Sequence, residues 1–248
     1  MIRRILWAIT GSGSFLRDLV QLFIKLREEF GSRVEVAVAL SSAGEEVARI
    51  YGVLDMLSRV ASNTRYGGIY RDSSSSSGYP LAGRVGAGKY DLVVIAPATS
   101  NTVAKVVCGI ADTLPTIAAS QALKSRTPLI ILPSDYSEES VTQLPCRIEV
   151  SKCTSCGECL KEGFCPYHAV IAAADAYPLI DYSKCRGCGV CILRCPASAF
   201  VCWEEVVVRA SKIDLENVAK LESIEEVKVV KSLKELEEVI RYFIVARA

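Results

Sequence analysis

Eleven of the 248 residues are cysteine, and eight of these fall between positions 153 and 195. Six of the eight form two C-x2-C-x2-C triplets, and each triplet is followed by a Cys-Pro pair. Three thiolates at this spacing can each reach a different iron of one cubane cluster, whereas the fourth cysteine of two-cluster ferredoxins ligates the other cluster. The triplets are Cys153, Cys156, Cys159 and Cys185, Cys188, Cys191, and the Cys-Pro cysteines are Cys165 and Cys195.

Exchange of the fourth cysteine between the two copies predicts two [4Fe-4S] clusters on a small α+β module like a bacterial ferredoxin. The second copy fits C-x2-C-x2-C-x3-C-P throughout, whereas in the first copy five residues separate Cys159 from Cys165 where three are usual. This departure leaves the shape of that loop open. One cluster is assigned to Cys153, Cys156, Cys159 and Cys195, and the other to Cys185, Cys188, Cys191 and Cys165.

Zinc is the alternative metal, because paired C-x2-C motifs also build structural zinc sites. A tetrahedral zinc needs two such pairs, which would leave the third cysteine of each triplet and both Cys-Pro cysteines unexplained. The spacing therefore favours iron–sulfur. Among the other cysteines, Cys108 is interpreted as core packing on an apolar helix, and Cys146 and Cys202 receive no chemical role. The single histidine, His168, is interpreted as an exposed or capping residue at a short helix start.

Three hydroxyl-rich turns follow three apolar segments of the chain. Each could be ordinary helix capping, but the carboxyl ends of parallel strands share one edge of a sheet, where ligands gather. Glycines allow close backbone approach to a phosphate, and the helix N-terminus favours its negative charge. The set therefore predicts one phosphate-binding crevice. The turns are Thr10-Gly11-Ser12-Gly13-Ser14, Ser41-Ser42, and Pro97-Ala98-Thr99-Ser100-Asn101-Thr102.

Strands and helices alternate in the part of the chain that carries these turns. Apolar runs at 2–10, 34–40, 91–97 and 128–133 read as strands, with helices over about 15–30 and after each later turn. Fully apolar strands separated by helices are typical of a parallel sheet covered on both faces. The expected fold class is a doubly wound, Rossmann-like α/β domain. Residues 63–90 are rich in Gly, Ser and Tyr and are expected to form a long loop, in which the run Ser73 to Ser77 is either a flexible surface stretch or a lid.

Composition changes at two points and predicts three parts. Residues 1–145 form the α/β domain with the crevice, and residues 146–203 form the two-cluster module. Residues 204–248 contain strand patterns at 204–210 and 227–230 and two helical segments. The α/β character therefore resumes after the cysteines, so we expect this tail to pack back on the first domain.

Charge and hydropathy exclude several classes of partner. The net charge is +1, which does not indicate a nucleic acid or another polyanion. No apolar run approaches the ~18–20 residues of a membrane-spanning helix, and the apolar stretch Ile5 to Ile9 is shorter than the core of a signal peptide. A cytoplasmic protein without a membrane partner is expected.

The crevice residues resemble a known group of proteins. Together with the segment Gly109 to Leu114, the turn Gly11 to Ser14 and the hexapeptide Pro97 to Thr102 resemble the homo-oligomeric FMN-binding flavoproteins, which include cysteine decarboxylases and flavin prenyltransferases. The resemblance covers about residues 1–135, and the hexapeptide looks like the P-A-S-A-N-T motif of that group. It implies that Ser12, Ser14 and Ser41 lie at the FMN phosphate. It also implies that the hexapeptide lies against the isoalloxazine, with Asn101 as the candidate catalytic residue.

Two departures argue against decarboxylation. The active-site histidine of the decarboxylases has no counterpart in residues 1–145, and Pro133-Ser134-Asp135 stands where their P-A-M-N motif is expected. A flavin domain joined to a two-cluster module resembles the archaeal iron–sulfur flavoproteins of the dihydromethanopterin reductase and archaeoflavoprotein group. This resemblance, and not spacing or composition, implies a pterin substrate. The resemblance to the FMN-binding flavoproteins also implies a homo-oligomer, a trimer or an assembly of trimers.

The leading hypothesis follows from combining one-electron clusters with a two-electron flavin. A low-potential donor such as ferredoxin feeds the clusters, FMN collects the electrons, and dihydromethanopterin is reduced to the tetrahydro form. Asp112 and Asp135 are the candidate proton donors, although either could be a helix cap. The alternative is an electron carrier that reduces a partner protein and has no small-molecule substrate. A test of whether pterin alone reoxidises the reduced flavin separates the two.

Overall fold

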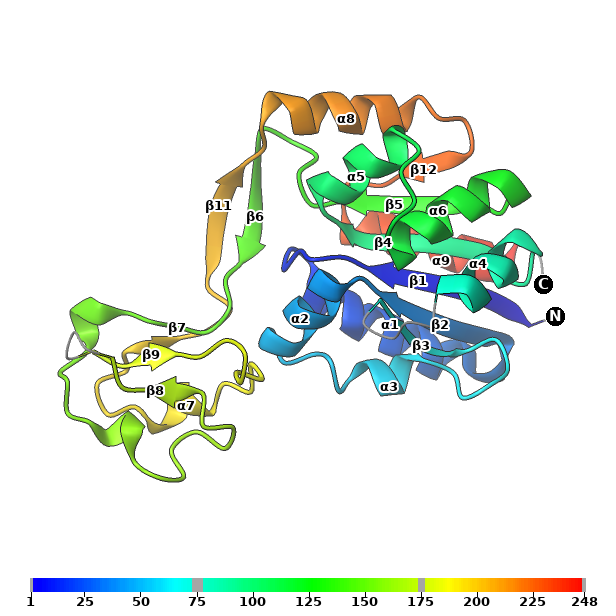
Figure 1. The fold of residues 1–248 in the computed structure, drawn as a ribbon. Helices are drawn as coiled ribbons and strands as arrows, with labels where there is room; N and C mark the ends of the chain where they lie inside the picture. The colour runs from blue at the N-terminus through cyan, green and yellow to red at the C-terminus, as the bar shows by residue number, and fades with distance from the viewer. Residues whose placement is uncertain (1, 73–77, 174–176, 247–248) are drawn as a thin grey trace.

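A six-stranded parallel sheet forms the centre of the computed structural model, which describes residues 2–72, 78–173 and 177–246 (Figure 1). The strand order is β12-β5-β4-β1-β2-β3. The chain winds outward from β1 in one direction and then from β4 in the other, so the doubly wound prediction is confirmed. The strands are β1 (Arg3–Ile9), β2 (Val34–Leu40), β3 (Gly68–Arg71), β4 (Leu92–Ala98), β5 (Leu129–Pro133) and β12 (Val227–Val229).

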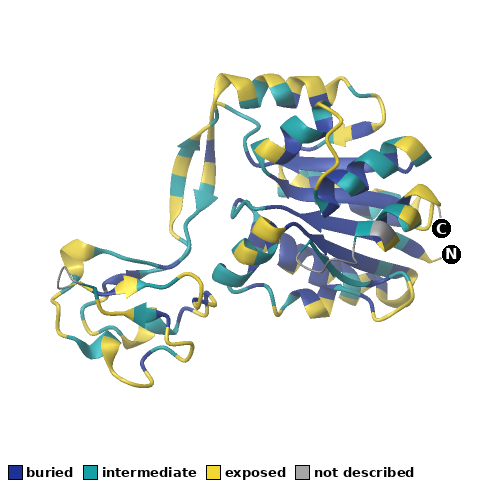
Figure 2. Cartoon of the chain, in the orientation of Figure 1, coloured by how far each residue is buried: buried dark blue, intermediate teal, exposed yellow. Residues whose placement is uncertain are grey.

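Helices cover both faces of the sheet, and the buried residues form a layer between them (Figure 2). Alternate residues of β1 point to opposite faces, so that Trp7 packs in one cluster and Leu6 in the other. Trp7 stacks on Phe23 at 4.1 Å between ring centroids. One face carries α1 (Leu16–Phe30), α2 (Ser42–Ile50), α3 (Leu57–Val60) and α9 (Leu233–Val245), and the other carries α4 (Gly78–Gly86), α5 (Ser100–Val107), α6 (Leu114–Ser125) and α8 (Lys212–Glu222). Among the described helices, none is both long and apolar enough to cross a membrane.

Residues 63–90 do not form the continuous loop that composition predicts. The structure contains β3 at the edge of the sheet and the helix α4 in this segment. Composition misleads here because β3 is short and only half-buried, and because α4 contains Gly and Pro, which have poor helix propensity. Burial of Leu81 and Val85 against the sheet outweighs that propensity. The serine run proposed as a lid lies outside the described residues.

A two-stranded antiparallel ribbon connects the sheet domain to the cysteine-rich module (Figure 1). The ribbon consists of β6 (Glu139–Gln143) and β11 (Glu205–Arg209), so the predicted strand at 204–210 pairs outside the main sheet. After the ribbon, α8 leads to β12, which pairs with β5 in the main sheet. The module contains β7 (Arg147–Ile148) paired with β10 (Phe200–Val201), β8 (Val170–Ile171) paired with β9 (Leu179–Ile180), and the short helix α7 (Val190–Arg194).

Candidate cluster and flavin sites

The eight clustered cysteines line two separate cavities in the module. In each cavity, three cysteines come from one triplet and the fourth comes from the Cys-Pro pair of the other copy, which is the exchange that the spacing predicts. Cysteine side chains from both copies therefore converge on each cavity. The first cavity is lined by Cys153, Cys156, Cys159 and Cys195, and the second cavity by Cys185, Cys188, Cys191 and Cys165.

The two halves of the module repeat the same local geometry. The Sγ of Cys165 accepts a hydrogen bond from the backbone N–H of Ala169, and the Sγ of Cys195 accepts one from Ala199, both at 3.4 Å. His168 and Ser198 occupy the equivalent turn position, each with φ of +50°. His168 is exposed, as expected, but it lies in a turn and not at a helix start.

The longer loop between Cys159 and Cys165 is held by the opposite half of the module. The guanidinium of Arg194, in the last turn of α7, donates hydrogen bonds to the carbonyl oxygens of Gly163 and, at 2.8 Å, of Phe164. Gly163 supplies the positive φ, +79°, that the turn requires. The two additional residues therefore form a turn on the surface, and Cys165 still reaches the second cavity.

Three of the cysteines lie in environments that disfavour a bare thiolate. Burial raises the pKa of the Cys159 and Cys185 thiols, and burial raises the pKa of Cys191 to about 11. A buried thiolate is stabilised by a bound metal, which supplies the compensating positive charge. Grouped sulfur ligands of this kind fit an iron–sulfur cluster in each cavity.

The three remaining cysteines differ from the sequence interpretation. Cys108 is exposed at the end of α5, so it is not part of the core as expected. The α5 helix ends there because Gly109 adopts a positive φ of +72°. Cys146 and Cys202, which received no role, form a disulfide across 56 residues. Sequence contained one signal for this pair, namely that the two cysteines flank the module almost symmetrically.

The loops after β1, β2 and β4 meet at one edge of the sheet. The Thr10 hydroxyl donates to the carbonyl oxygen of Pro97 at 2.7 Å and accepts from the backbone N–H of Thr99 at 2.9 Å. The backbone N–H of Ser41 donates to the carbonyl oxygen of Ile9 at 3.1 Å. Because β1 and β4 are the strands between which the winding reverses, these loops border the topological switch point, where ligands of such folds bind.

Glycine is required at two positions of the first loop. A Cβ at Gly11 would lie 2.7 Å from that of Ala43, and a Cβ at Gly13 would overlap the hydroxyl of Tyr51. The Ser12 hydroxyl accepts from the backbone N–H of Ser14 at 3.2 Å. The closely packed loop therefore presents backbone and hydroxyl groups at the start of α1, as a phosphate cradle requires.

The hexapeptide divides between buried and exposed positions. Thr99 caps α5 by accepting from the backbone N–H of Thr102, and Thr102 is buried. Ser41 caps α2 in the same way through Gly44, so capping and a place in the crevice are compatible for both residues. Ser100 donates to the carboxylate of Asp135 at 2.6 Å. Asn101 lies exposed in the first turn of α5, where its amide is available to a ligand.

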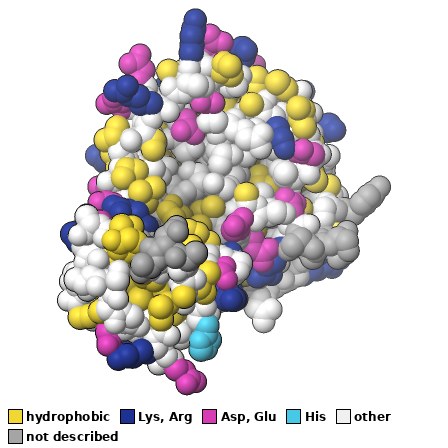
Figure 3. Space-filling view, turned by 60° about the vertical axis from the view of Figure 1, so that its left-hand side comes forward, with side chains coloured by type: hydrophobic (Ala, Val, Ile, Leu, Met, Phe, Trp, Pro, Cys, Tyr) yellow, Lys and Arg dark blue, Asp and Glu magenta, His cyan; other side chains and the backbone are white. Residues whose placement is uncertain are grey.

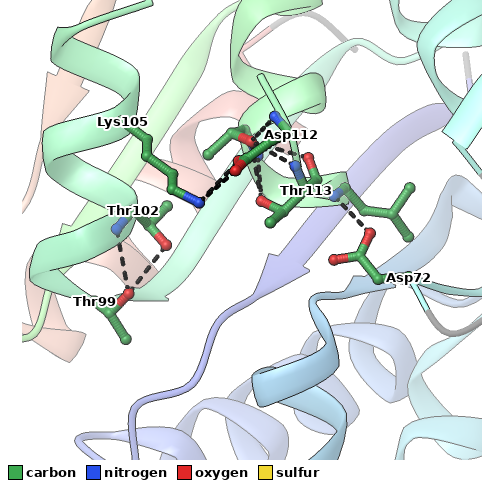
Figure 4. A network of polar contacts seen from close by, with 8 residues as sticks. Asp72, Thr99, Thr102, Lys105, Asp112 and Thr113 are labelled. Carbon is green, nitrogen blue, oxygen red and sulfur yellow. Dashed lines mark hydrogen bonds and ion pairs between the residues drawn. The ribbon is translucent and has the colours of Figure 1, made fainter. Parts of the chain in front are cut away.

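A polar network borders this edge of the sheet beside α5 and α6 (Figure 4). Lys105 contacts both carboxylate oxygens of Asp112, at 2.9 and 2.7 Å. The hydrogen bond from Lys105 lowers the pKa of Asp112, so this residue stays ionised at neutral pH and is a poor proton donor. Burial instead raises the pKa of Asp72, which accepts from the backbone N–H groups of Leu114, at 2.8 Å, and of Ser42. Sequence reasoning missed Asp72 because β3, which it follows, was not recognised.

The second cavity faces the sheet domain. The guanidinium of Arg49, in the last turn of α2, donates to the carbonyl oxygens of Tyr182 at 2.6 Å and Cys185 at 2.8 Å. Gly52, just after α2, packs so closely on the loop of Gly187 that neither glycine could carry a side chain. These contacts dock the second triplet against the helix that starts at the Ser41 turn.

A second connection leads from this cavity to α1. A Cβ at Gly189 would lie 2.8 Å from the indole ring of Trp203, the last residue of the module. The guanidinium of Arg17 lies 3.9 Å from the centroid of that ring and also donates to the carbonyl oxygen of Tyr51 at 2.9 Å. Burial lowers the pKa of Arg17, and its position near the start of α1 joins the module to the loop Gly11 to Ser14, the predicted phosphate cradle.

Comparison with known proteins agrees with the geometry of both sites. Residues 1–142 match the family model described as Flavoprotein. The chain belongs to this family. Residues 145–196 of this flavoprotein match a second model, described as 4Fe-4S dicluster domain. Both expected cofactor classes, a flavin and two [4Fe-4S] clusters, are therefore confirmed, whereas the individual ligand residues stay predictions.

Two similar proteins of known name are archaeal. A protein of Methanosarcina mazei named dihydromethanopterin reductase (acceptor) is 36% identical over 90% of this flavoprotein and 92% of its own chain. A protein of the same name from Methanocaldococcus jannaschii is 39% identical over 90% of this flavoprotein and 89% of its own chain. The resemblance inferred from the sequence to the dihydromethanopterin reductase group is confirmed.

Solved structures agree with the fold. DmrB of Burkholderia xenovorans in complex with FMN, described as a cubic protein cage for redox transfer, superposes with a TM-score of 0.62 at 28% identity, over 99% of this flavoprotein and 97% of DmrB. An FMN-dependent decarboxylase of Escherichia coli O157:H7 has a TM-score of 0.52 at 14% identity, over 98% of this flavoprotein and 92% of its own chain. The second match supports the fold alone.

Proposed function

We propose that this flavoprotein takes single electrons from a low-potential, ferredoxin-like donor, passes them through its two clusters to FMN, and reduces dihydromethanopterin to tetrahydromethanopterin. The names of the two archaeal relatives support the reaction, and FMN in DmrB supports the identity of the flavin. The enzyme is an oxidoreductase of the dihydromethanopterin reductase (acceptor) type.

The observation that carries this proposal is the docking of the second cavity against α1 and α2. Both helices start at loops of the phosphate cradle and crevice, so the contacts of Arg49 and Trp203 join the second cluster site to the flavin site. The second cluster is therefore the inner one, next to the flavin, and the first cluster is the outer one, where electrons enter. Iron–sulfur clusters exchange single electrons, whereas FMN supplies two-electron chemistry at the pterin.

The outer part of the module offers a surface for the donor. Hydrophobic side chains gather on the part of the molecule that faces forward in Figure 3. Leu160, which lines the first cavity, is 44% exposed. An apolar surface beside a cluster suits a short-lived contact with another redox protein, because such contacts are small and need few fixed polar pairs.

The chain's own residues then have defined tasks in the flavin site. Gly11 to Ser14 bind the FMN phosphate at the start of α1, and Thr10 holds the loop after β1 against the hexapeptide. Ser41, Ser42 and the hexapeptide form the walls of the crevice. Asn101 presents its amide to the flavin or the pterin from the first turn of α5. Positioning of this kind is the protein's contribution to cofactor chemistry.

We also propose a homo-oligomeric assembly and a cytoplasmic location. The cubic protein cage described for DmrB supports a homo-oligomer for this chain also. A trimer as its unit is proposed from the resemblance to the FMN-binding flavoproteins alone. An exposed Asn101 is consistent with a crevice that a second subunit completes. Oxygen-sensitive clusters and a soluble pterin substrate suit a reducing cytoplasm.

The test is anaerobic reconstitution followed by a single-turnover reaction. The holoprotein, with iron, sulfide and FMN quantified per chain, is reduced photochemically and mixed with dihydromethanopterin while the flavin absorbance is followed. Reoxidation with formation of the tetrahydro pterin is the expected outcome. If the flavin stays reduced with pterin but is reoxidised by a partner protein, the chain is an electron carrier and the proposed substrate is wrong.

A further inference from the structure

The Cys146–Cys202 disulfide lies at the point where the module joins the ribbon. Ile148 pairs with Phe200 and Arg147 pairs with Val201, so the next opposing pair in this register is Cys146 and Cys202. Their Cα atoms lie 3.8 Å apart. Strand pairing on both sides therefore keeps the two cysteines opposite each other, whether or not their sulfurs are bonded.

The disulfide also borders the second cavity. The Sγ atoms of Cys146, Cys202 and the cluster cysteine Cys191 all lie within 4.8 Å of one another. Cys146 is 1% exposed and lines the cavity together with Cys185 and Cys188. A sulfur in the wall of a cluster site, so close to a sulfur that ligates the cluster, is in direct position to exchange electrons with it.

On its other side, the disulfide adjoins the contact with the sheet domain. Cys202 is followed by Trp203, whose ring contacts Arg17 near the start of α1. The backbone N–H of Trp203 donates to the carbonyl oxygen of Leu144 at 2.9 Å, which closes the ribbon beside the disulfide. The disulfide therefore lies between the second cluster site and the flavin domain, along the connection that electrons must cross.

We propose that Cys146 and Cys202 form a third redox centre of this chain, a disulfide that is opened and closed through the second cluster. Opening consumes two electrons and two protons: the S–S bond breaks, each sulfur becomes a thiol, and the protons come from water. The electrons arrive one at a time through the cluster, supplied by the same low-potential donor. Closing releases the two protons and returns the two electrons one at a time through the cluster, which passes each on to the flavin before it takes the next.

The chemistry of the compartment supports a redox role over a purely structural one. Outside the disulfide-rich proteins of hyperthermophiles, disulfides are rare in a reducing cytoplasm, and those that occur there are mostly catalytic or redox-sensing. The position of this pair in the wall of a cluster cavity, close to Cys191, favours the redox role here. The compartment argument for a redox role relies on the cytoplasmic location proposed above. The redox centre itself requires only the clusters and does not depend on which substrate the flavin reduces. A pair that stores two electrons beside the clusters would let the flavin be reduced again without a new encounter with the donor.

Electron counting tests the proposal on the anaerobic holoprotein. Photochemical one-electron reduction is titrated in the wild type, in Cys146→Ser/Cys202→Ser, and in the control Cys108→Ser, which alters an exposed cysteine outside the module. With equal iron and flavin, the wild type and the control should accept about two electrons more per chain than the double variant. Equal uptake in all three proteins would overturn the proposal.

Thiol labelling gives an independent result that needs no disulfide variant. Samples are quenched in denaturant with an alkylating reagent, and labelled cysteines are located by mass spectrometry. Cys146 and Cys202 should be unlabelled in the oxidised holoprotein and labelled after photoreduction, and Cys165→Ser, which disrupts the second cluster site, should lose this light-driven opening. Labelling already in the oxidised protein, or none after full reduction, contradicts the proposal. The pterin assay is separate, so failure here leaves the proposed reaction standing.

Discussion

Gly52 and Gly187 pack backbone against backbone where the sheet domain meets the cluster module. Gly52 has φ of +74°, and a Cβ added there would overlap the carbonyl oxygen of Gly187. A Cβ at Gly187 would in turn overlap the carbonyl oxygen of Ile50. This contact sets how closely the second cluster site approaches α2.

We expect Gly52→Ala to slow reduction of the flavin through the clusters by roughly tenfold or more, because small displacements of reacting groups have large effects on rate. Iron and flavin content should not change. Stopped-flow reduction of the flavin measures the rate. The matched control is Gly88→Ala, since Gly88 also has a positive φ, +62°, but open space around it. Equal slowing in both variants would mean that backbone strain, and not the contact, is responsible.

Arg49 should raise the reduction potential of the second cluster. Its positive charge lies at the carbonyl oxygen of Cys185 and stabilises the more negative, reduced form. We expect Arg49→Met to lower that potential by an amount on the order of tens of mV, measured by an EPR-monitored redox titration. Arg59→Met, which removes an exposed ion pair with Glu28, is the control and should leave both potentials unchanged.

Double variants can test whether Cys165 and Cys195 are exchanged between the two cluster sites. Cys195→Ser and Cys153→Ser should each remove the first cluster, so the double variant should still retain about four irons per chain. Cys195→Ser combined with Cys185→Ser should instead lose nearly all iron. Iron and sulfide analysis after anaerobic reconstitution gives the answer. The opposite pattern would assign Cys195 to the triplet that precedes it directly in sequence.

Ser12 should contribute to flavin affinity. Loss of its hydroxyl removes one hydrogen bond near a charged phosphate, so Ser12→Ala should weaken FMN binding by about tenfold, or ~1.4 kcal/mol. Fluorescence titration of the flavin-free protein with FMN measures this. Ser58→Ala, whose exposed hydroxyl donates only to the carbonyl oxygen of Asp55 nearby, should bind FMN as the wild type does.

Tyr90 should make the sheet domain sensitive to alkaline pH. Burial raises the pKa of Tyr90 far above its ordinary value, and its hydroxyl donates to the carbonyl oxygen of Tyr66 at 3.0 Å. A raised pKa in the folded state contributes stability below the unfolded value of about 10, and this stability is lost as the pH rises above it. Unfolding free energies between pH 8 and about 11 should therefore fall more steeply in the wild type than in Tyr90→Phe. If the unfolding free energy falls equally with pH in both proteins, the raised pKa of Tyr90 does not contribute to stability.

Local sequence patterns were sufficient to predict much of the fold and the cluster sites. The apolar runs of β1, β2, β4 and β5 are buried on both faces, so their composition alone predicts a parallel sheet. The cysteine spacing predicted the two iron–sulfur clusters, because ligands two residues apart reach one cluster through local backbone geometry. The hydroxyl-rich turns were recognisable for a similar reason, since capping and phosphate binding both depend on residues close in sequence.

Contacts between segments distant in sequence could be identified only in the tertiary structure. The segment with β3 and α4 has weak local propensities and is stabilised by burial of Leu81 and Val85, so composition could not reveal it, nor the place of Asp72. Cys146 and Cys202, which are 56 residues apart, meet because β7 and β10 pair in a particular register. The contact of Arg17 with Trp203 likewise depends on how the module docks. Sequence determined which groups the chain carries, and tertiary packing decided which of them are neighbours, because side-chain contacts between distant segments leave no periodic signal in a single sequence.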